Sequence, residues 1–347
     1  MRNWTMSEVS KNVREMFQKG DDIRDAGLTT PEDVLRYDDI VYGKDTTWQV
    51  MDLYRPKAAG DQTLPVIVSF HGGGWVYGDK ERYQYYCMNL AQQGFAVVNF
   101  TYRLAPEFKF PAPLVDANLV FCWIMEHSRE YHLDTDQIFA VGDSAGAHGL
   151  ALYSCLIGNA DYRHSFAHYA SDSFLEKFHK DYEGDVEVAW GDLQGEALLE
   201  AINCGDFTTI DTEGFHLPEG LNIRALGLNC GKYAMEVGDN PMTGLDMMAE
   251  YLPEHVTEWE LDMVYVLHHL TEAFPPSYVL TAPKDFLKEE APLMAKALTE
   301  RDINNVYRMY ADPEKELGHV FHCNMKLEHA AKVNREECAF FKEFINR

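Results

Sequence analysis

The stretch QIFAVGDSAGAHG, residues 137–149, indicates the fold of this chain, and a serine lies at its centre. Residues 137–143 form a short, mostly apolar run typical of a buried strand, and small residues follow at once. Gly142 and Gly146 flank Ser144 at G-x-S-x-G spacing, which suits a sharp turn from a strand into a helix because neither glycine carries a Cβ. Such a turn projects the serine hydroxyl above the carboxyl edge of a sheet. The spacing alone leaves two interpretations open, a nucleophile and a structural turn.

A second glycine motif points to what a nucleophile at Ser144 needs. HGGGW, residues 71–75, directly follows the apolar run 64–70, and its three glycines let backbone amides approach a ligand closely. A flexible loop and a phosphate-binding loop are the alternatives, but the G-x-x-x-x-G-K-[ST] pattern of the latter does not occur in the sequence. Together with the Ala145 amide at the start of the expected helix, the loop predicts an oxyanion hole.

Apolar runs and helical segments alternate along most of the chain. Runs without polar alternation suit strands that are buried on both faces of a parallel sheet. This alternation of strands and helices therefore predicts an α/β fold with a mostly parallel central sheet flanked by helices. The expected strands are 38–43, 48–56, 64–70, 95–102, 137–143, 223–229, 277–282 and 306–311, and the expected helices are 83–92, 112–128, 289–301 and 328–345.

Two segments do not follow this alternation of strands and helices. Residues 1–38 are expected to be helical, because their apolar residues recur on one face at helical spacing. Residues from about 160 to 222 are rich in aromatic and acidic residues and give no clear run of strands. We expect 1–38 to be an N-terminal helical cap segment and 39–347 a catalytic domain that carries an insertion at about 160–222. The insertion is either part of the cap or a structural appendage.

Composition limits the classes of function. A hydrophobic fraction of 46% excludes disorder, and the net charge of −26 argues against nucleic acid or an anionic membrane as partner. No apolar run is long enough to span a bilayer, and the first residues lack the apolar core of a signal peptide. Seven cysteines without a C-x-x-C pair suggest neither a disulfide framework nor a zinc knuckle, so a reducing cytoplasm is expected. The spacing of the histidines predicts no metal site.

Three motifs together resemble the hormone-sensitive-lipase-like branch of the α/β-hydrolases: HGGGW at 71–75, YRLAPEFKFPAPLVDA at 102–117 and GDSAGA at 142–147. Members of this branch are largely carboxylesterases and lipases. The resemblance implies an α/β-hydrolase fold with a helical cap and no cofactor. It implies an oxyanion hole built by the amides of Gly73, Gly74 and Ala145, with Gly72 as a further candidate. It also implies structural support around the nucleophile from Arg103, Glu107, Pro111 and Asp116.

A triad acid and base are expected after Ser144 in the order Ser, Asp, His. Asp285 follows the expected strand 277–282 and resembles the D-x-L motif of the family, and His319 resembles its H-G-F motif with valine in place of the glycine. The rival candidates are Glu289 and Glu290 for the acid, and His322, His268 and His269 for the base.

These residues predict a serine carboxylesterase that hydrolyses short-to-medium acyl esters of small molecules through an acyl-enzyme intermediate. Deacetylation of acetylated sugars and hydrolysis of aryl formamides are alternatives that use the same triad. A non-catalytic ligand-binding protein of the same fold is an alternative of another class. A homodimer is compatible with the sequence, but no residue pattern demands one.

Overall fold

A computed structural model describes residues 7–169, 209–211, 214–235, 245–253 and 256–345. Its centre is an eight-stranded sheet in the order β1-β2-β4-β3-β5-β8-β9-β10. The first two strands are paired antiparallel, β2 is also antiparallel to β4, and every later pairing is parallel, as expected for an α/β fold. The strands are β1 (Val34–Val41), β2 (Val50–Pro56), β3 (Leu64–Phe70), β4 (Ala96–Phe100), β5 (Leu133–Asp143), β8 (Ile223–Asn229), β9 (Ser277–Thr281) and β10 (Asn305–Met309).

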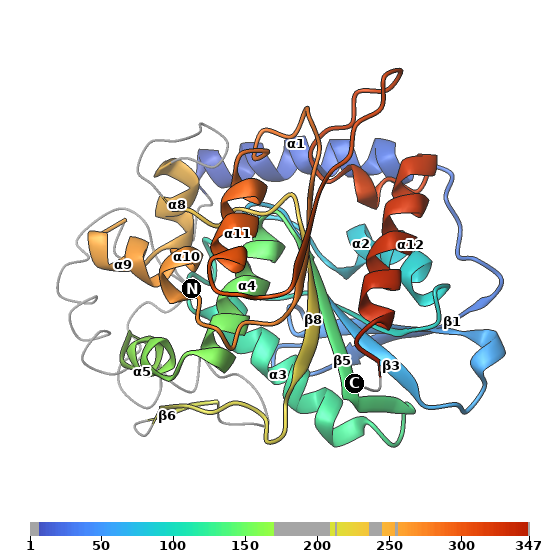
Figure 1. The fold of residues 1–347 in the computed structure, drawn as a ribbon, viewed down its shortest axis with the longest axis horizontal. Helices are drawn as coiled ribbons and strands as arrows, with labels where there is room; N and C mark the ends of the chain where they lie inside the picture. The colour runs from blue at the N-terminus through green and yellow to red at the C-terminus, as the bar shows by residue number, and fades with distance from the viewer. Residues whose placement is uncertain (1–6, 170–208, 212–213, 236–244, 254–255, 346–347) are drawn as a thin grey trace, which may run out of the picture.

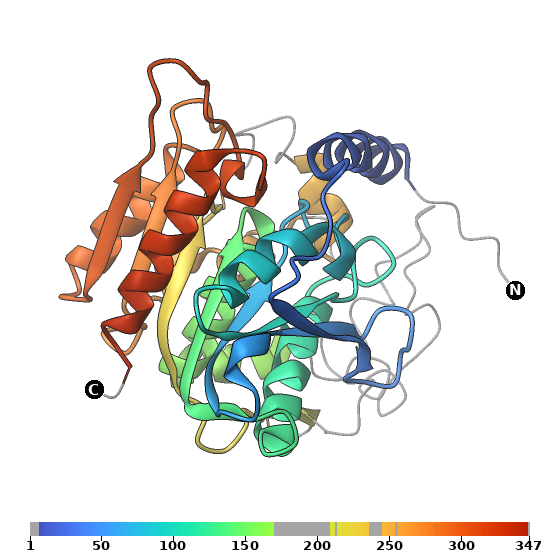
Figure 2. The same cartoon turned by 90° about the vertical axis from the view of Figure 1, so that its right-hand side faces the viewer.

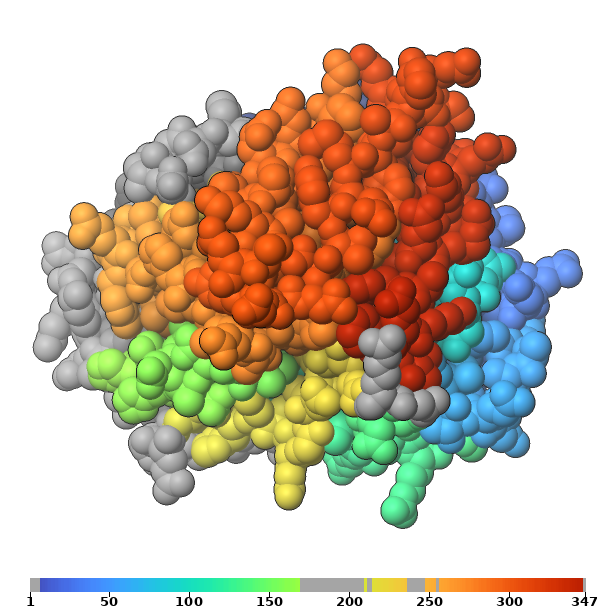
Figure 3. Space-filling model, viewed as in Figure 1, coloured from blue at the N-terminus to red at the C-terminus, as the bar shows by residue number. Residues whose placement is uncertain are grey.

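Helices cover both faces of this sheet, which Figure 1 shows nearly edge-on. In β3, Val66 and Val68 pack into one apolar cluster and Ile67 between them packs into the other, so the strand is buried on both faces. One cluster includes α3 (Ala112–His127), α4 (Ala145–Gly158) and α11 (Glu290–Thr299), and the other includes α2 (Lys80–Ala91) and α12 (Glu328–Lys342). In Figure 3 the C-terminal part of the chain, coloured orange to red, makes up much of the side that faces the viewer.

The N-terminal helix is shorter than the sequence pattern predicts. Helix α1 spans Glu8–Asp25, and its N-cap Ser7 accepts a hydrogen bond from the Ser10 amide. The expectation of a helix through residue 38 is wrong, because β1 begins at Val34. Gly27 adopts a left-handed φ of 82° just after the helix, and Pro31 prevents it from resuming.

Helix α1 lies across the top of the molecule in Figure 1 and is seen nearly end-on in Figure 2. Its Arg14 side chain makes four hydrogen bonds to other segments. The guanidinium donates to the Val76 carbonyl at 2.6 Å, to the Ala105 carbonyl at 3.0 Å and to both carboxylate oxygens of Glu107 at 2.8 and 2.6 Å. On the same helix, the Ser10 hydroxyl donates to Glu250 at 2.7 Å. These contacts tie α1 to the loops that contain Val76 and Glu107 and to the helix that contains Glu250.

The remaining helices of the described residues lie beside the sheet. They are α5 (Ala160–Tyr169), α8 (Leu245–Tyr251), α9 (Glu258–Met263) and α10 (Val266–His269), with short 3₁₀ turns η1 (Lys57–Ala59) and η2 (Phe321–Cys323). Of the expected insertion at 160–222, the structure describes α5 and a two-stranded ribbon of β6 (Ile210–Asp211) and β7 (Gly214–Phe215), whereas 170–208 lie outside the described residues. Within the described ranges, none of the helices has the length and apolar character needed to cross a membrane.

Candidate active site

Ser144 occupies a strained turn between β5 and α4. Its φ and ψ are 52° and −117°, a conformation that non-glycine residues rarely adopt. The flanking glycines are required by close packing. A Cβ on Gly142 would lie 2.7 Å from the Gly146 carbonyl oxygen, and a Cβ on Gly146 would lie 2.1 Å from the Phe70 carbonyl oxygen. The turn therefore has the form of a nucleophile elbow, as the spacing predicts.

Asp285 and His319 are joined by a hydrogen bond. Asp285 lies in the turn after β9, and its Oδ1 accepts from Nδ1 of His319 at 2.7 Å. The same carboxylate accepts from the Leu287 amide and from the Thr281 hydroxyl, each at 2.8 Å. Burial alone would raise the pKa of Asp285, but the hydrogen bond and charge of His319, followed by the other two donors, hold this pKa below its ordinary value. An ionised Asp285 keeps the proton on Nδ1 and leaves Nε2 of His319 as the basic atom.

Ser144 and His319 line one cavity of about 200 Å³ at the end of the sheet. Among the described residues no hydrogen bond joins the Ser144 hydroxyl to the imidazole, and contacts of this kind commonly tighten only when substrate is bound. The cavity is lined by Met16, Phe17, Gly20, Asp21, Arg24, Gly72, Gly73, Gly74, Tyr77, Tyr83, Asp143, Ser144, Met247, Phe286, His319 and Val320.

The glycine loop 72–74 presents its backbone to this cavity. Gly73 and Gly74 have φ of 124° and 60°, and a Cβ on Gly73 would lie 2.0 Å from the Tyr77 carbonyl oxygen. Their amides have no hydrogen-bond partner among the described residues, and the Ala145 amide is at the first position of α4, where no intrahelical acceptor exists. The Gly72 amide instead donates to the Tyr83 hydroxyl at 2.9 Å. The Gly72 amide is therefore engaged, and the amides of Gly73, Gly74 and Ala145 are the donors without a partner in the described part of the chain.

A buried histidine, which the sequence motifs do not reveal, holds the end of this loop. Nε1 of Trp75 donates to Nδ1 of His148 at 3.2 Å, and Nε2 of His148 donates to the Val264 carbonyl at 2.8 Å. Burial lowers the pKa of His148 to about 4, so the ring is neutral and can accept from the indole. Trp75 also stacks on Tyr251 with ring centroids 5.0 Å apart. These contacts fix the residue that follows Gly74.

Residues 102–117, one of the three motifs shared with the hormone-sensitive-lipase-like branch, make structural contacts outside the cavity. Arg103 and Asp116 form a fully buried ion pair at 2.7 Å, and Asp116 also accepts from the Gln49 amide at 2.8 Å. Pro111 is the N-cap residue of α3, and Glu107 receives Arg14 from α1. None of these lines the cavity.

The rival residues lie elsewhere or have other partners. Glu290 accepts from the amides of Tyr233 and Ala234 and pairs with Lys232, while Glu289 is exposed beside it. His268 pairs with Asp262 at 2.7 Å, and both side chains are more than half exposed. His269 contacts the Asp262 carbonyl, and His322 is fully buried beside Cys323.

Asp143, the residue before the nucleophile, is a further titratable group at the site. Its carboxyl accepts from the Tyr83 hydroxyl at 2.7 Å, and burial raises its pKa to about 7 although Tyr83 and then His319 lower it. Tyr83 thus binds both the Gly72 amide and the residue that precedes Ser144. Only the contact of α2 with the sheet brings this tyrosine to the site.

Helix α1 supplies one wall of the cavity, with Met16 and Phe17 near Met247 and with Asp21 and Arg24 further along. The polar side chains at this end of the cavity bind one another. Tyr77 donates to Asp21 at 3.0 Å, and Arg24 contacts Asp21 at 2.8 Å. The cavity therefore has an apolar side and a polar end whose charges already have partners.

Parts of the chain are similar in sequence to known proteins. Residues 51–189 match the BD-FAE family model. Over 96 residues the chain is 42% identical to Esterase LipI of Mycobacterium tuberculosis, an alignment that covers 27% of this chain and 30% of LipI. Tuliposide A-converting enzyme 2 of Tulipa gesneriana is 37% identical over 107 residues, which cover 27% of this chain and 28% of that protein. The alignments thus span less than a third of these curated relatives.

Solved structures extend the likeness to nearly the whole fold. Esterase B from Lactobacillus rhamnosis superposes with a TM-score of 0.73 at 21% identity, covering 97% of this chain and 95% of that one. The esterase from Pyrobaculum calidifontis gives a TM-score of 0.64 at 22% identity, covering 96% and 93%. The expected α/β-hydrolase fold is confirmed.

Proposed function

We propose that this chain, an α/β-hydrolase related to the hormone-sensitive-lipase-like esterases, is a serine carboxylesterase that acts on short-to-medium acyl esters of small molecules. The observation that carries the proposal is the Asp285–His319 hydrogen bond of 2.7 Å at a cavity that Ser144 also lines. The strained turn at Ser144 and the unpartnered amides of Gly73 and Gly74 support it. The esterase names of the curated relatives point to the same reaction.

The proposed mechanism has two acyl-transfer steps. Nε2 of His319 takes the proton of the Ser144 hydroxyl as Oγ attacks the ester carbonyl, and the amides of Gly73, Gly74 and Ala145 bind the oxyanion. His319 then gives that proton to the departing alkoxide, which leaves as the alcohol and yields an acyl-enzyme. In the second step His319 deprotonates a water molecule that attacks the acyl carbon, and the proton returns to Oγ as the acid leaves.

Asp285 contributes by charge and orientation. It holds Nδ1–H of His319 at 2.7 Å and stabilises the imidazolium that forms in both steps. The Leu287 amide and the Thr281 hydroxyl keep the carboxylate ionised and aimed at the ring. Each oxyanion donor typically lowers the barrier by about 3 kcal/mol.

The cavity supports a limited acyl length. A volume of about 200 Å³ is below the range of drug-sized pockets, and its apolar wall comes from Met16, Phe17 and Met247. Because two of these residues belong to α1, we propose that α1 is a cap that sets the preference for acyl length. The part of the insertion at 170–208 lies outside the described residues and adds nothing to this argument.

The test is a substrate panel with a covalent probe. We expect turnover of p-nitrophenyl esters that declines as the acyl chain lengthens, with slower turnover of N-formylkynurenine and acetylated xylose. A fluorophosphonate should label the wild type and leave Ser144→Ala unlabelled. Turnover of the formamide or the acetylated sugar alone would contradict the carboxylesterase assignment. A folded wild type that neither turns over nor reacts with the probe would favour a ligand-binding protein.

A cytoplasmic location and a homodimer remain predictions. The six cysteines within the described ranges are free, five of them buried, which suits a reducing compartment. Fractionation of the native host would test the location, and sedimentation of the purified chain would test the dimer.

A further inference from the structure

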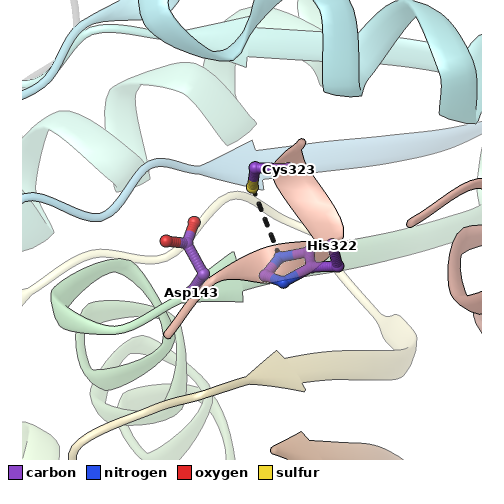
Figure 4. A group of neighbouring side chains, drawn as sticks. All are labelled: Asp143, His322 and Cys323. Carbon is purple, nitrogen blue, oxygen red and sulfur yellow. Dashed lines mark hydrogen bonds between the residues drawn. The ribbon is translucent and has the colours of Figure 1, made fainter. Parts of the chain in front are cut away.

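A second cluster of reactive side chains lies behind the nucleophile. Asp143 comes from the end of β5, and His322 and Cys323 come from η2, as Figure 4 shows. All three residues are at least 98% buried, and their ligand atoms lie within 4.8 Å of one another. We propose that these three side chains form a binding site for one divalent cation of the zinc class.

The spacing of the sulfur and nitrogen atoms fits such an ion. Sγ of Cys323 and Nε2 of His322 are 3.5 Å apart, along the dashed line of Figure 4. Two ligands bonded at about 2.3 Å and about 2.05 Å to a tetrahedral zinc ion are separated by about 3.6 Å. A carboxylate oxygen of Asp143 lies within 4.8 Å of the Cys323 sulfur and of one imidazole nitrogen of His322, so closing the site needs a movement on the order of 1 Å.

The kinds of atom also suit this ion. The cluster offers one sulfur, one imidazole nitrogen and one carboxylate oxygen, which are the three ligand types that zinc takes from proteins. A thiolate and a carboxylate together balance two positive charges, so the loaded site would be neutral where a net charge is costly. The Tyr83 hydroxyl donates to Asp143 at 2.7 Å and would orient the carboxylate from outside the site.

The imidazole of His322 lacks strong partners in its present surroundings. Its Nδ1 has no hydrogen-bond partner among the described residues, and its Nε2 has only the weak contact with the Cys323 thiol. A fully buried imidazole normally has a partner on at least one nitrogen. A metal bond at Nε2 would supply one.

The active-site cavity gives an ion access to this cluster. An ion bound here can also be distinguished from one bound at the triad. Asp143 and Tyr83 line the active-site cavity, so the carboxylate is the edge of the cluster that an incoming cation meets. The ligand atoms of a separate group, Cys230, Asp285 and His319, also lie within 4.8 Å of one another, but Asp285 and His319 belong to the proposed triad. The two groups contain different cysteines, which gives the experiment its control.

The experiment is a titration of the full chain with Co²⁺, a spectroscopic substitute for Zn²⁺. We expect one equivalent to bind and to give a thiolate-to-cobalt charge-transfer band. Cys323→Ser should abolish this band and weaken binding by at least about 100-fold, and His322→Gln should weaken it similarly. Cys230→Ser should keep the band. Its absence in the wild type, its survival in Cys323→Ser, or its loss in Cys230→Ser would each overturn the proposal.

A measurement that needs no variant covers the case in which a substituted core fails to fold. Crystals of the wild-type chain soaked in a zinc salt should show an anomalous peak bonded to Asp143, His322 and Cys323. A peak at Cys230, or none at either cysteine, would refute the site. Neither readout uses ester turnover, so the result is independent of the proposed function.

Discussion

Substituting one glycine of the serine turn should disable the site through a backbone collision. In Gly146→Ala the new Cβ would lie 2.1 Å from the Phe70 carbonyl oxygen and 2.5 Å from that of His71. Carbon and oxygen atoms normally approach no closer than about 3.3 Å, so the start of α4 and the end of β3 must separate by about 1 Å. The colliding atoms belong to the backbone and cannot rotate away.

That separation opens the proposed oxyanion hole. The Ala145 amide moves with α4, whereas the amides of Gly73 and Gly74 follow the end of β3. A misplacement of about 1 Å costs on the order of 100-fold in rate, and overpacking of this kind destabilises a fold by about 1–3 kcal/mol. We therefore expect kcat/KM for p-nitrophenyl acetate to fall about 100-fold or more, with a lower melting temperature.

Gly149→Ala is the matched control, three residues further along α4. Its Cβ would lie 3.9 Å from Leu114 Cδ2 and 4.0 Å from Phe70 Cδ1, which are ordinary contacts. Alanine in a helix interior is favoured over glycine by about 0.5–1 kcal/mol, so this variant should be active and slightly more stable. The reasoning is refuted if folded Gly146→Ala keeps kcat/KM within about threefold of Gly149→Ala.

Three further predictions address the triad, the cap and the core. Asp285→Asn should lower kcat by about 10⁴-fold with little change in KM, because the imidazolium loses its counter-charge, and steady-state kinetics would contradict this if kcat fell less than tenfold. Arg14→Met removes the hydrogen bonds to Val76 and Glu107, so it should lower the free energy of unfolding by about 2 kcal/mol and change the ratio of kcat/KM for short esters to that for long esters. Lys19→Met, at an exposed position of the same helix, should change neither quantity. An unaltered ratio in Arg14→Met would argue against a cap. Burial raises the pKa of Glu337 to about 7, so the native state holds a proton that the unfolded state releases near pH 4.5, and stability should fall as pH rises from 4.5 through 7. Glu337→Gln should flatten this slope and be more stable than the wild type at pH 8 in urea unfolding, and a less stable variant at pH 8 would be the contrary result.

The central strands could be predicted because burial on both faces leaves a plain mark in the sequence. The apolar runs 64–70 and 223–229 coincide with β3 and β8. The helical expectation for 1–38 failed at its end because a one-face apolar pattern says little about where a helix stops. Gly27 and Pro31 carried that information.

Candidate site residues could be named from the sequence where a short motif follows a strand. Ser144, Asp285 and His319 each lie in such a motif, and the structure brings the last two into contact and all but Asp285 to one cavity. Tyr83 and His148 could not be predicted, because their roles arise only when helices pack on the sheet. The engagement of the Gly72 amide by Tyr83 is of the same kind.

Spacing rules do not single out the cluster of Asp143, His322 and Cys323 that we propose as a metal site. Metal motifs are recognised by ligands a few residues apart on one element. Here one ligand lies far from the other two along the chain, and only folding brings the end of β5 next to η2.

The attachment of Arg14 to the Val76 carbonyl has a practical consequence for anyone who produces this protein. Val76 lies two residues beyond Gly74, so a displacement of the first helix should also displace the amides that we propose bind the substrate oxygen. Changes that displace this helix should therefore alter the kinetics, whereas additions after α12 leave the hydrogen bond between Arg14 and Val76 in place. Recombinant material intended for kinetics is therefore best tagged at its C-terminus.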